Sequence, residues 1–241
     1  MIKLTQHSIV YVVNNNYIDP LLASLNSLKL NSGLYGQTNI IILHTQGFDK
    51  HRLKNYDLIF KEFNEPQIKF SRNWGLNPAS KFEIFKINGY KKILYLDCDT
   101  IILKDISDIF KIEGDVVITA LKKIKNIIYN GTQKGFNAGV MVISEKYLND
   151  KTYNDLTDLA NRNLLTGNQN VLNFYFKDKI SCMPLCYNTC LDQLKYINRK
   201  DIKILHFIEY KPWLNKSTKY IDTHLGMIEK FLLKRIYYRY V

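Results

Sequence analysis

An apolar segment that ends in two aspartates one residue apart constrains the fold of this chain more than any other feature. Residues 91–102 read Lys-Lys-Ile-Leu-Tyr-Leu-Asp-Cys-Asp-Thr-Ile-Ile. Because side chains alternate along an extended chain, we expect Asp97 and Asp99 to lie on the same face where the strand ends. Ligands of open α/β sheets bind at that end, and two carboxylates there suit a hard divalent cation. The segment therefore predicts a cation site at the end of a buried strand.

Strand-like and helix-like segments alternate along the rest of the chain. The expected strands are 7–13, 39–43, 58–63, 91–96, 116–120, the segment 135–143 (which enters its strand from a loop) and 202–207. The expected helices are 20–30, 53–56, 79–87, 147–161, 169–176 and 223–240. Such alternation predicts an α/β fold with a Rossmann-like, mostly parallel central sheet flanked by helices. Without a repeat or a flexible linker, a single domain over residues 1–241 is the simplest organisation, with 223–241 as its C-terminal basic and aromatic helix.

Composition limits the classes of partner. With 46% hydrophobic and 13% aromatic residues, the chain can bury a core, so disorder is not expected. The net charge of +12 favours an acidic partner such as a sugar nucleotide, a nucleic acid or an anionic membrane, although enrichment in Lys, Asn, Ile and Tyr explains it equally well. Nucleic acid is not expected as a partner, because no recognised nucleic-acid-binding motif is present, and a nucleic-acid-binding protein is the least favoured alternative function.

The chain also gives indications of its compartment. The first ten residues contain no apolar region of a signal peptide, and no apolar run approaches the ~20 residues of a membrane span. Four cysteines without a secretory signal indicate reduced thiols and a cytoplasmic location. Cys182, Cys186 and Cys190 are four apart, which is helical spacing, and a zinc site would need a fourth ligand and a closer pair.

The segment 202–213 contains a second group of candidate site residues. His206 lies near the end of an expected strand and Lys211 follows in the sequence His-Phe-Ile-Glu-Tyr-Lys-Pro-Trp. An imidazole can complete an oxygen-rich site for Mn²⁺, and a lysine reaches a phosphate as a point charge. Alone, His206 would be an ordinary histidine at the end of a strand. Together with the acidic pair, it is a candidate metal ligand.

Three further segments have both a structural and a functional interpretation. Gly167-Asn-Gln-Asn170 opens a helix, where Asn168 either caps the helix or contacts a sugar. Phe136-Asn-Ala-Gly139 precedes a strand and either forms a turn or lets a ligand approach the backbone. Lys81 lies early in a helix and is either solvated or directed at an anion.

Taken together, these segments resemble the glycogenin-like retaining glycosyltransferases of glycosyltransferase family 8. Four motifs occur in the family's order between residues 9 and 213: Leu-Tyr-Leu-Asp-Cys-Asp, Phe-Asn-Ala-Gly-Val, Gly-Asn-Gln-Asn and His-Phe followed by Lys-Pro-Trp. The resemblance implies a GT-A fold, a UDP-sugar donor and a bound Mn²⁺, with Mg²⁺ as the alternative.

The resemblance also implies roles for individual positions. The positions that match the family's metal ligands are Asp97, Asp99 and His206. Those that match its donor-binding residues are Asn14 and Tyr17 for uracil, Lys81 and Lys211 for the phosphates, Leu96 and Cys98 within the acidic motif, and Asn137 and Ala138 beside the sugar. Gln169 matches the glutamine on the far face of the anomeric carbon, and Asn168 precedes it.

The chain departs from the family pattern at two positions. Asn168 stands where the family usually has Asp, which keeps the shape of the hydrogen-bonding group but loses its charge. Glu209 stands where a glycine is usual, in a loop that is one residue shorter before Lys211. The first departure leaves open a UDP-sugar-binding protein without transfer activity.

The expected activity is transfer of a hexose, with glucose or galactose as the first choices, from a UDP-sugar to a hydroxyl with retention. Since Asn168 and Gln169 are poor nucleophiles, attack on the same face is favoured over a covalent intermediate. The acceptor is a glycan, a protein or a lipid, and self-glycosylation at Tyr196 is one alternative. The basic and aromatic tail either packs on the domain or lies on an anionic membrane. A homodimer is left open.

Overall fold

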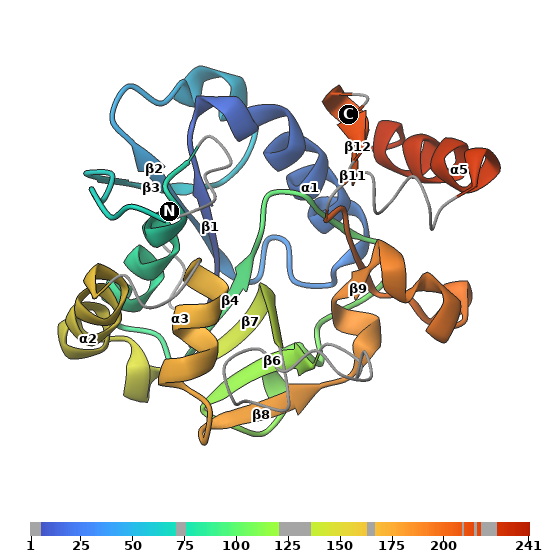
Figure 1. Ribbon diagram of the computed structural model, residues 1–241. Helices are drawn as coiled ribbons and strands as arrows, with labels where there is room; N and C mark the ends of the chain where they lie inside the picture. The colour runs from blue at the N-terminus through green and yellow to red at the C-terminus, as the bar shows by residue number, and fades with distance from the viewer. Residues whose placement is uncertain are drawn as a thin grey trace.

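The computed structural model describes residues 6–70, 76–120, 136–162, 167–208, 210–214, 216–217 and 226–241. Its centre is a seven-stranded sheet in the order β3-β2-β1-β4-β7-β6-β8 (Figure 1). The strands are β1 (His7–Val13), β2 (Asn39–Thr45), β3 (Ile59–Phe63), β4 (Lys92–Leu96), β6 (Val116–Ala120), β7 (Phe136–Ser144) and β8 (Ile180–Met183). β1 to β4 are mutually parallel and β8 is parallel to β6, whereas β7 is antiparallel to both its neighbours. The predicted mostly parallel sheet is confirmed.

Alternation along the strands divides the core between the two faces of this sheet. On β1, Ile9, Tyr11 and Val13 pack with residues of α1 (Ile18–Asn31). Val10 and Val12 point to the other face, which is covered by η3 (Pro78–Lys86), α2 (Asp150–Asn161) and α3 (Asn168–Tyr175). Because both faces are covered, strands such as β2 read as unbroken apolar runs in the sequence.

A second, three-stranded sheet lies beside the carboxyl end of β4. It contains β5 (Thr100–Ile102), β10 (Ile204–His206) and β9 (Thr189–Cys190), in that order. β10 runs antiparallel to β5, and this register places His206 opposite Thr100. The small sheet thus brings a late segment of the chain next to the acidic pair. A two-stranded ladder follows, formed by β11 (Tyr210–Lys211) and β12 (Lys216–Ser217).

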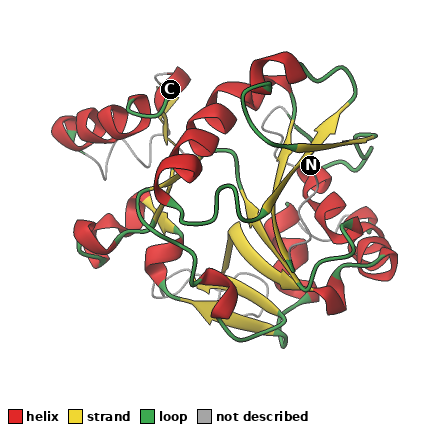
Figure 2. Cartoon of the chain, turned by 180° about the vertical axis from the view of Figure 1, so that it is seen from behind, coloured by secondary structure: helices red, strands yellow, loops and turns green. Residues whose placement is uncertain are grey.

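The C-terminal helix α5 (Met227–Tyr238) lies at the periphery, on the same side as α1 (Figure 2). Its Leu233 and Tyr237 are buried against the small sheet, and Asn26 of α1 donates to the Tyr240 carbonyl over 2.8 Å. No helix in the described part of the chain combines the length and the apolar character that crossing a membrane requires. The remaining short helices are η1 (Asn15–Tyr17), η2 (Lys50–Leu53), η4 (Ile109–Lys111), η5 (Glu145–Tyr147), η6 (Leu185–Tyr187), η7 (Leu191–Tyr196), η8 (Arg199–Asp201) and η9 (Pro212–Leu214).

Several predicted elements differ from the structure. The helix expected at 53–56 is a 3₁₀ turn that ends at Leu53, and the helix at 79–87 is the 3₁₀ helix η3. The helix expected from 147 begins at Asp150, because the Asn149 side chain accepts from the Thr152 N–H (2.9 Å) and caps it there.

One further expectation was wrong in a way that matters for the site. The segment expected as a loop before a strand, Phe136 to Gly139, is part of β7 itself. Despite their helical spacing, Cys182, Cys186 and Cys190 do not lie on one helix but on β8, η6 and β9. Of the predicted C-terminal helix, residues 223–225 lie outside the described residues, as does Glu209.

Candidate active site

The acidic pair lies in a turn between two sheets, not in a continued strand. Thr100 donates from its backbone N–H (3.1 Å) and from its Oγ1 (2.8 Å) to the Asp97 carbonyl, which closes the turn from β4 into β5. The Asp97 N–H donates to the Gly139 carbonyl, and the Phe207 N–H to the Asp99 carbonyl. Strand alternation was therefore the wrong reason for expecting the two carboxylates on one side, although the turn does bring them together.

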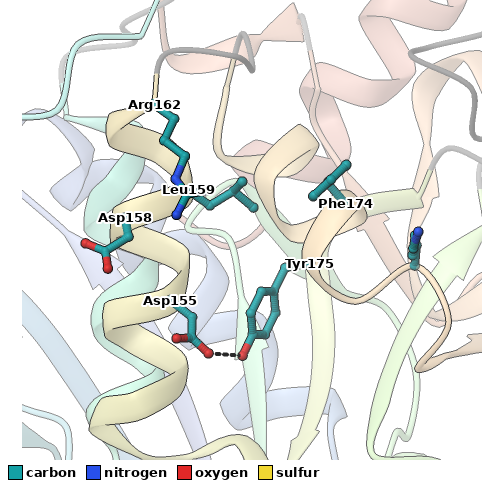
Figure 3. A pocket seen from close by; sticks show the side chains of 7 residues that line it. Asp155, Asp158, Leu159, Arg162, Phe174 and Tyr175 are labelled. Carbon is teal, nitrogen blue, oxygen red and sulfur yellow. Dashed lines mark hydrogen bonds between the residues drawn. The ribbon is translucent and has the colours of Figure 1, made fainter.

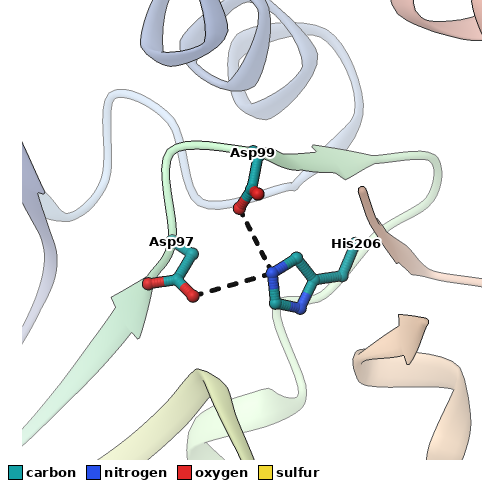
Figure 4. A group of neighbouring side chains, drawn as sticks. All are labelled: Asp97, Asp99 and His206. Atoms are coloured by element: carbon teal, nitrogen blue, oxygen red, sulfur yellow. Dashed lines mark ion pairs between the residues drawn. The ribbon is translucent and has the colours of Figure 1, made fainter. Parts of the chain in front are cut away.

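His206 completes a compact group with these carboxylates (Figure 4). Its Nε2 is 3.2 Å from Asp99 Oδ1 and 3.6 Å from Asp97 Oδ2. Among the described residues, this is the one group of three or more His, Cys, Asp or Glu side chains whose ligand atoms lie within 4.8 Å of one another. Two oxygens and one imidazole nitrogen fit a divalent cation such as Mn²⁺. Neighbouring ligands of an octahedral ion lie about 3 Å apart, which is close to these spacings.

Two lysines approach the same carboxylates from the outside. Lys81 Nζ lies 2.9 Å from Asp97 Oδ1, and Lys211 Nζ forms an ion pair with Asp99 Oδ2. Each carboxylate therefore gives one oxygen to a lysine and turns the other towards His206. Positive charge thus adjoins the predicted cation site on two sides, as a phosphate-binding site requires.

Burial and charge set the protonation of this group. Burial favours the neutral form of Asp99, but the charge of Lys211 outweighs it and holds the pKa of Asp99 well below the ordinary value. Burial, reinforced by Asp97, raises the pKa of the Cys98 thiol well above its ordinary value. Cys98 Sγ lies 3.4 Å from the Val12 carbonyl, to which it donates. Asp99 is thus available as an anion, whereas Cys98 is a neutral thiol directed at β1.

Two residues that the sequence reasoning missed lie against this group. Tyr95, on β4, donates its hydroxyl to Asp97 Oδ1. Asn188, which directly precedes β9, places its Oδ1 3.0 Å from His206 Nδ1 and donates from Nδ2 to Asn137 Oδ1 over 2.8 Å. Tyr95 could have been found because it alternates with Asp97 along the chain. Asn188 has no recognisable motif around it.

The start of α3 faces the same end of the sheet. Gln169 Oε1 accepts from the Ala138 N–H (3.2 Å), so this glutamine contacts the β7 segment that the sequence predicted beside the donor sugar. Asn168 does not cap the helix, because Gly167 occupies the N-cap position. The Asn168 side chain instead donates from Nδ2 to the Pro78 carbonyl (2.9 Å) and links α3 to η3.

The predicted uracil-binding residues follow β1. Asn14 accepts from the Asn16 N–H (3.1 Å) and caps η1, where Tyr17 is partly buried. Burial raises the pKa of Tyr17 and the charge of Asp99 raises it further, which places this phenol within the electrostatic field of the acidic pair. Leu96 is fully buried in the core, so its side chain is not available to a ligand.

A separate hollow of about 400 Å³ lies between α2 and α3 (Figure 3). Its lining includes Asp155 and Tyr175, whose hydroxyl donates to Asp155 Oδ2 (2.8 Å), together with Arg162. None of the predicted site residues lines it. The group at the end of β4 is therefore the better candidate for the chemistry.

Solved structures identify the fold. A galactosyltransferase, LgtC, in complex with donor and acceptor sugar analogs superposes with a TM-score of 0.75 at 14% identity, covering 97% of this chain and 96% of that one. This likeness places the chain among proteins with the GT-A glycosyltransferase fold. The predicted fold class is thereby confirmed.

A family model described as "Glycosyl transferase family 8" matches residues 8–217. The chain therefore belongs to glycosyltransferase family 8, and the resemblance drawn from its motifs is confirmed. Glycosyltransferase GlyE of Streptococcus pneumoniae serotype 4 is 35% identical over 102 residues, which cover 40% of this chain and 24% of that protein. Glycogenin-1 of Mus musculus is 28% identical over 160 residues, which cover 59% of this chain and 44% of that protein. The chain thus spans less than half the length of these curated relatives.

Proposed function

We propose that this family 8 glycosyltransferase is a metal-dependent retaining hexosyltransferase that moves glucose or galactose from a UDP-sugar to a hydroxyl acceptor. The observation that carries the proposal is the arrangement of Asp97, Asp99 and His206 around one point, with Lys81 and Lys211 on its outer side. Such a site suits a diphosphate held together with a cation. Residues 1–241 act as a single catalytic domain in this proposal.

The three ligand residues would hold Mn²⁺, which as a Lewis acid would counter the negative charge that builds on the departing UDP. Lys81 and Lys211 add fixed positive charge close to the same place. Both are largely buried, with 12% and 19% of their side chains exposed, so solvent screens them little. Such preorganised charge commonly contributes ~10²–10³ in rate per group.

Retention is proposed to proceed by attack on the same face of the sugar. The backbone N–H of Ala138 can only donate, so it fixes Gln169 Oε1 as its acceptor and leaves the Nε2 of that amide for other contacts. Asn168 has no carboxylate either. Neither residue therefore offers a strong nucleophile for a covalent intermediate.

The test is UDP release from a panel of UDP-sugars, measured with Mn²⁺, with Mg²⁺ and with EDTA. Metal-dependent release from one sugar supports the proposal and identifies the donor. The matched control is Asp99→Ala, which removes a metal ligand and the partner of Lys211. Release that is unaffected by EDTA and by Asp99→Ala would contradict a role for this site.

A second candidate function is binding of a UDP-sugar without transfer, and Asn168 is the observation that favours it. The side chain donates to the Pro78 carbonyl, which a carboxylate could not do, so an aspartate would lose this link between α3 and η3. Tight UDP binding without release from any donor, in the presence of hydroxyl acceptors, would favour this alternative.

The acceptor is proposed to be a glycan, a protein or a lipid. Tyr196 is 50% exposed, so intact-mass analysis after incubation with the donor can test self-glycosylation. On α5, Met227, Phe231 and Tyr238 are exposed while the opposite face packs on the domain. Contact of this outer face with an anionic membrane is tested by vesicle sedimentation of wild type against Phe231→Glu.

A further inference from the structure

A short chain of amide groups leads from the backbone of β7 to His206. Asn137 Oδ1 accepts from the Gly139 N–H (2.9 Å), Asn188 Nδ2 donates to the same oxygen (2.8 Å), and Asn188 Oδ1 faces His206 Nδ1 (3.0 Å). All three side chains are buried, with Asn188 at 0% and His206 at 2% exposed. Water is therefore not available to substitute for any of these partners.

The direction of each hydrogen bond follows from the first. A backbone N–H can only donate, so the atom of Asn137 that faces Gly139 must be its oxygen. The atom of Asn188 that contacts this oxygen must then be the NH₂ group, which turns the Asn188 oxygen towards His206. An amide oxygen can only accept, so His206 Nδ1 must carry a proton.

We propose that Asn188 is a positioning residue that holds His206 as the tautomer with a proton on Nδ1 and a bare lone pair on Nε2. This inference rests on the proposed function in that the lone pair serves a cation. Nε2 points at Asp99 Oδ1 and Asp97 Oδ2, and three electron pairs that converge in this way repel one another unless a cation lies between them. The amide chain thus prepares the histidine to act as a ligand before any metal arrives.

The packing beside the imidazole reinforces this orientation. A Cβ built on Gly139 would lie 2.0 Å from His206 Cε1 and 2.6 Å from Nδ1, so the ring rests directly on the β7 backbone. A ring turned over would place Cδ2 where Nδ1 lies and would lose its hydrogen bond to Asn188. Orientation and tautomer are therefore fixed by the same segment.

The tautomer can be observed without any metal by ¹⁵N NMR of histidine-labelled protein in EDTA. We expect a proton on Nδ1 of His206 in the metal-free protein, held by its hydrogen bond to Asn188 Oδ1. A proton on Nε2 with a bare Nδ1 would overturn the proposal. This result does not depend on transfer activity, so absence of UDP release would refute the proposed function and leave the tautomer assignment standing.

Substitution of Asn188 tests the consequence for metal binding. We expect Asn188→Leu to lose the single tautomer and to weaken Mn²⁺ binding, measured by electron paramagnetic resonance with UDP present, by ~10–100-fold. Asn188→Asp keeps an acceptor for Nδ1, so it should retain the wild-type tautomer and bind Mn²⁺ more tightly than Asn188→Leu. Thr189→Val removes a buried hydroxyl from the next residue and should leave both readouts unchanged. Equal Mn²⁺ affinity in wild type and a folded Asn188→Leu would overturn the proposal.

Discussion

Substitution of Gly139 by alanine should damage the active site more than it destabilises the fold. The added Cβ would lie 2.0 Å from Cε1 of His206, and ordinary van der Waals contact begins at about 3.4 Å. The imidazole and the β7 backbone must therefore separate by more than 1 Å. Both are buried, and the backbone is held in the sheet between β4 and β6, so the side chain of His206 is the part that moves.

The expected loss of activity and the expected loss of stability differ in size. Misplacement of a reacting group by ~1 Å can cost ~10²-fold in activity, and we expect a loss of that order in metal-dependent UDP release. Overpacking of a core costs ~1–3 kcal/mol, which for a domain of this size lowers the melting temperature by about 2–12 °C. The folded variant would remain the major species at room temperature.

The assay combines Mn²⁺ binding, UDP release and thermal unfolding on the same preparation. The control is Gly226→Ala, because Gly226 has an ordinary φ of −65° and its Cβ would meet nothing closer than 4.0 Å. We expect the control to bind Mn²⁺ and release UDP as the wild type does, at a stability cost of at most about 1 kcal/mol. Wild-type Mn²⁺ affinity in Gly139→Ala would show that His206 does not need its observed position, and would refute the reasoning.

Three further predictions follow from individual contacts. Asp99→Asn keeps the shape of the side chain but leaves Lys211 without its counter-ion, so Mn²⁺-dependent UDP release should fall ~10²–10³-fold; release at the wild-type rate would contradict its role as a ligand. Asn168→Asp cannot donate to the Pro78 carbonyl, so calorimetry should show a loss of ~1–3 kcal/mol, and unchanged stability would show that this link contributes little. Burial raises the pKa of Tyr11 above its ordinary value, so above about pH 10 unfolding releases its proton and the free energy of unfolding falls as the pH rises. Tyr11→Phe should make that decline shallower by up to about 1.4 kcal/mol per pH unit in urea titrations, and an unchanged slope would exclude Tyr11 as a contributor.

The strands of the central sheet other than β8, which was missed, could be predicted from the sequence, because strands buried on both faces are continuous apolar runs. β2 and β4 are such runs, and their bounds agree with the predicted ones within two residues. The short strands β5 and β9 were missed, since three residues or fewer carry no periodic signal and form only where β10 pairs with them. Tertiary pairing, which the local sequence does not encode, decides these elements.

The candidate site likewise contains residues that the sequence predicts and residues whose role depends on tertiary contacts. Asp97, Asp99 and His206 were expected together because they recur in motifs, and the structure does bring them together. Asn188 could not be expected, because its role follows from hydrogen bonds to residues distant in the sequence. The prediction that the strand continues through the acidic segment was wrong for a related reason. Thr100 closes a turn there by its hydrogen bonds to the Asp97 carbonyl, although apolar residues continue on either side in the sequence.

The position of the acidic turn between two sheets has a consequence for how the protein acquires activity. Asp97 and Asp99 follow β4, which pairs with β1 early in the chain, but the imidazole arrives on β10 and its amide partner just before β9. A nascent or truncated chain that ends before β10 therefore holds two adjacent carboxylates with no third ligand. Because contacts between distant segments cost loop-closure entropy before they contribute to stability, we expect the proposed cation site to form only after the central sheet. Under the proposed function, metal affinity would accordingly report misassembly of the last third of the chain even where the central sheet has formed.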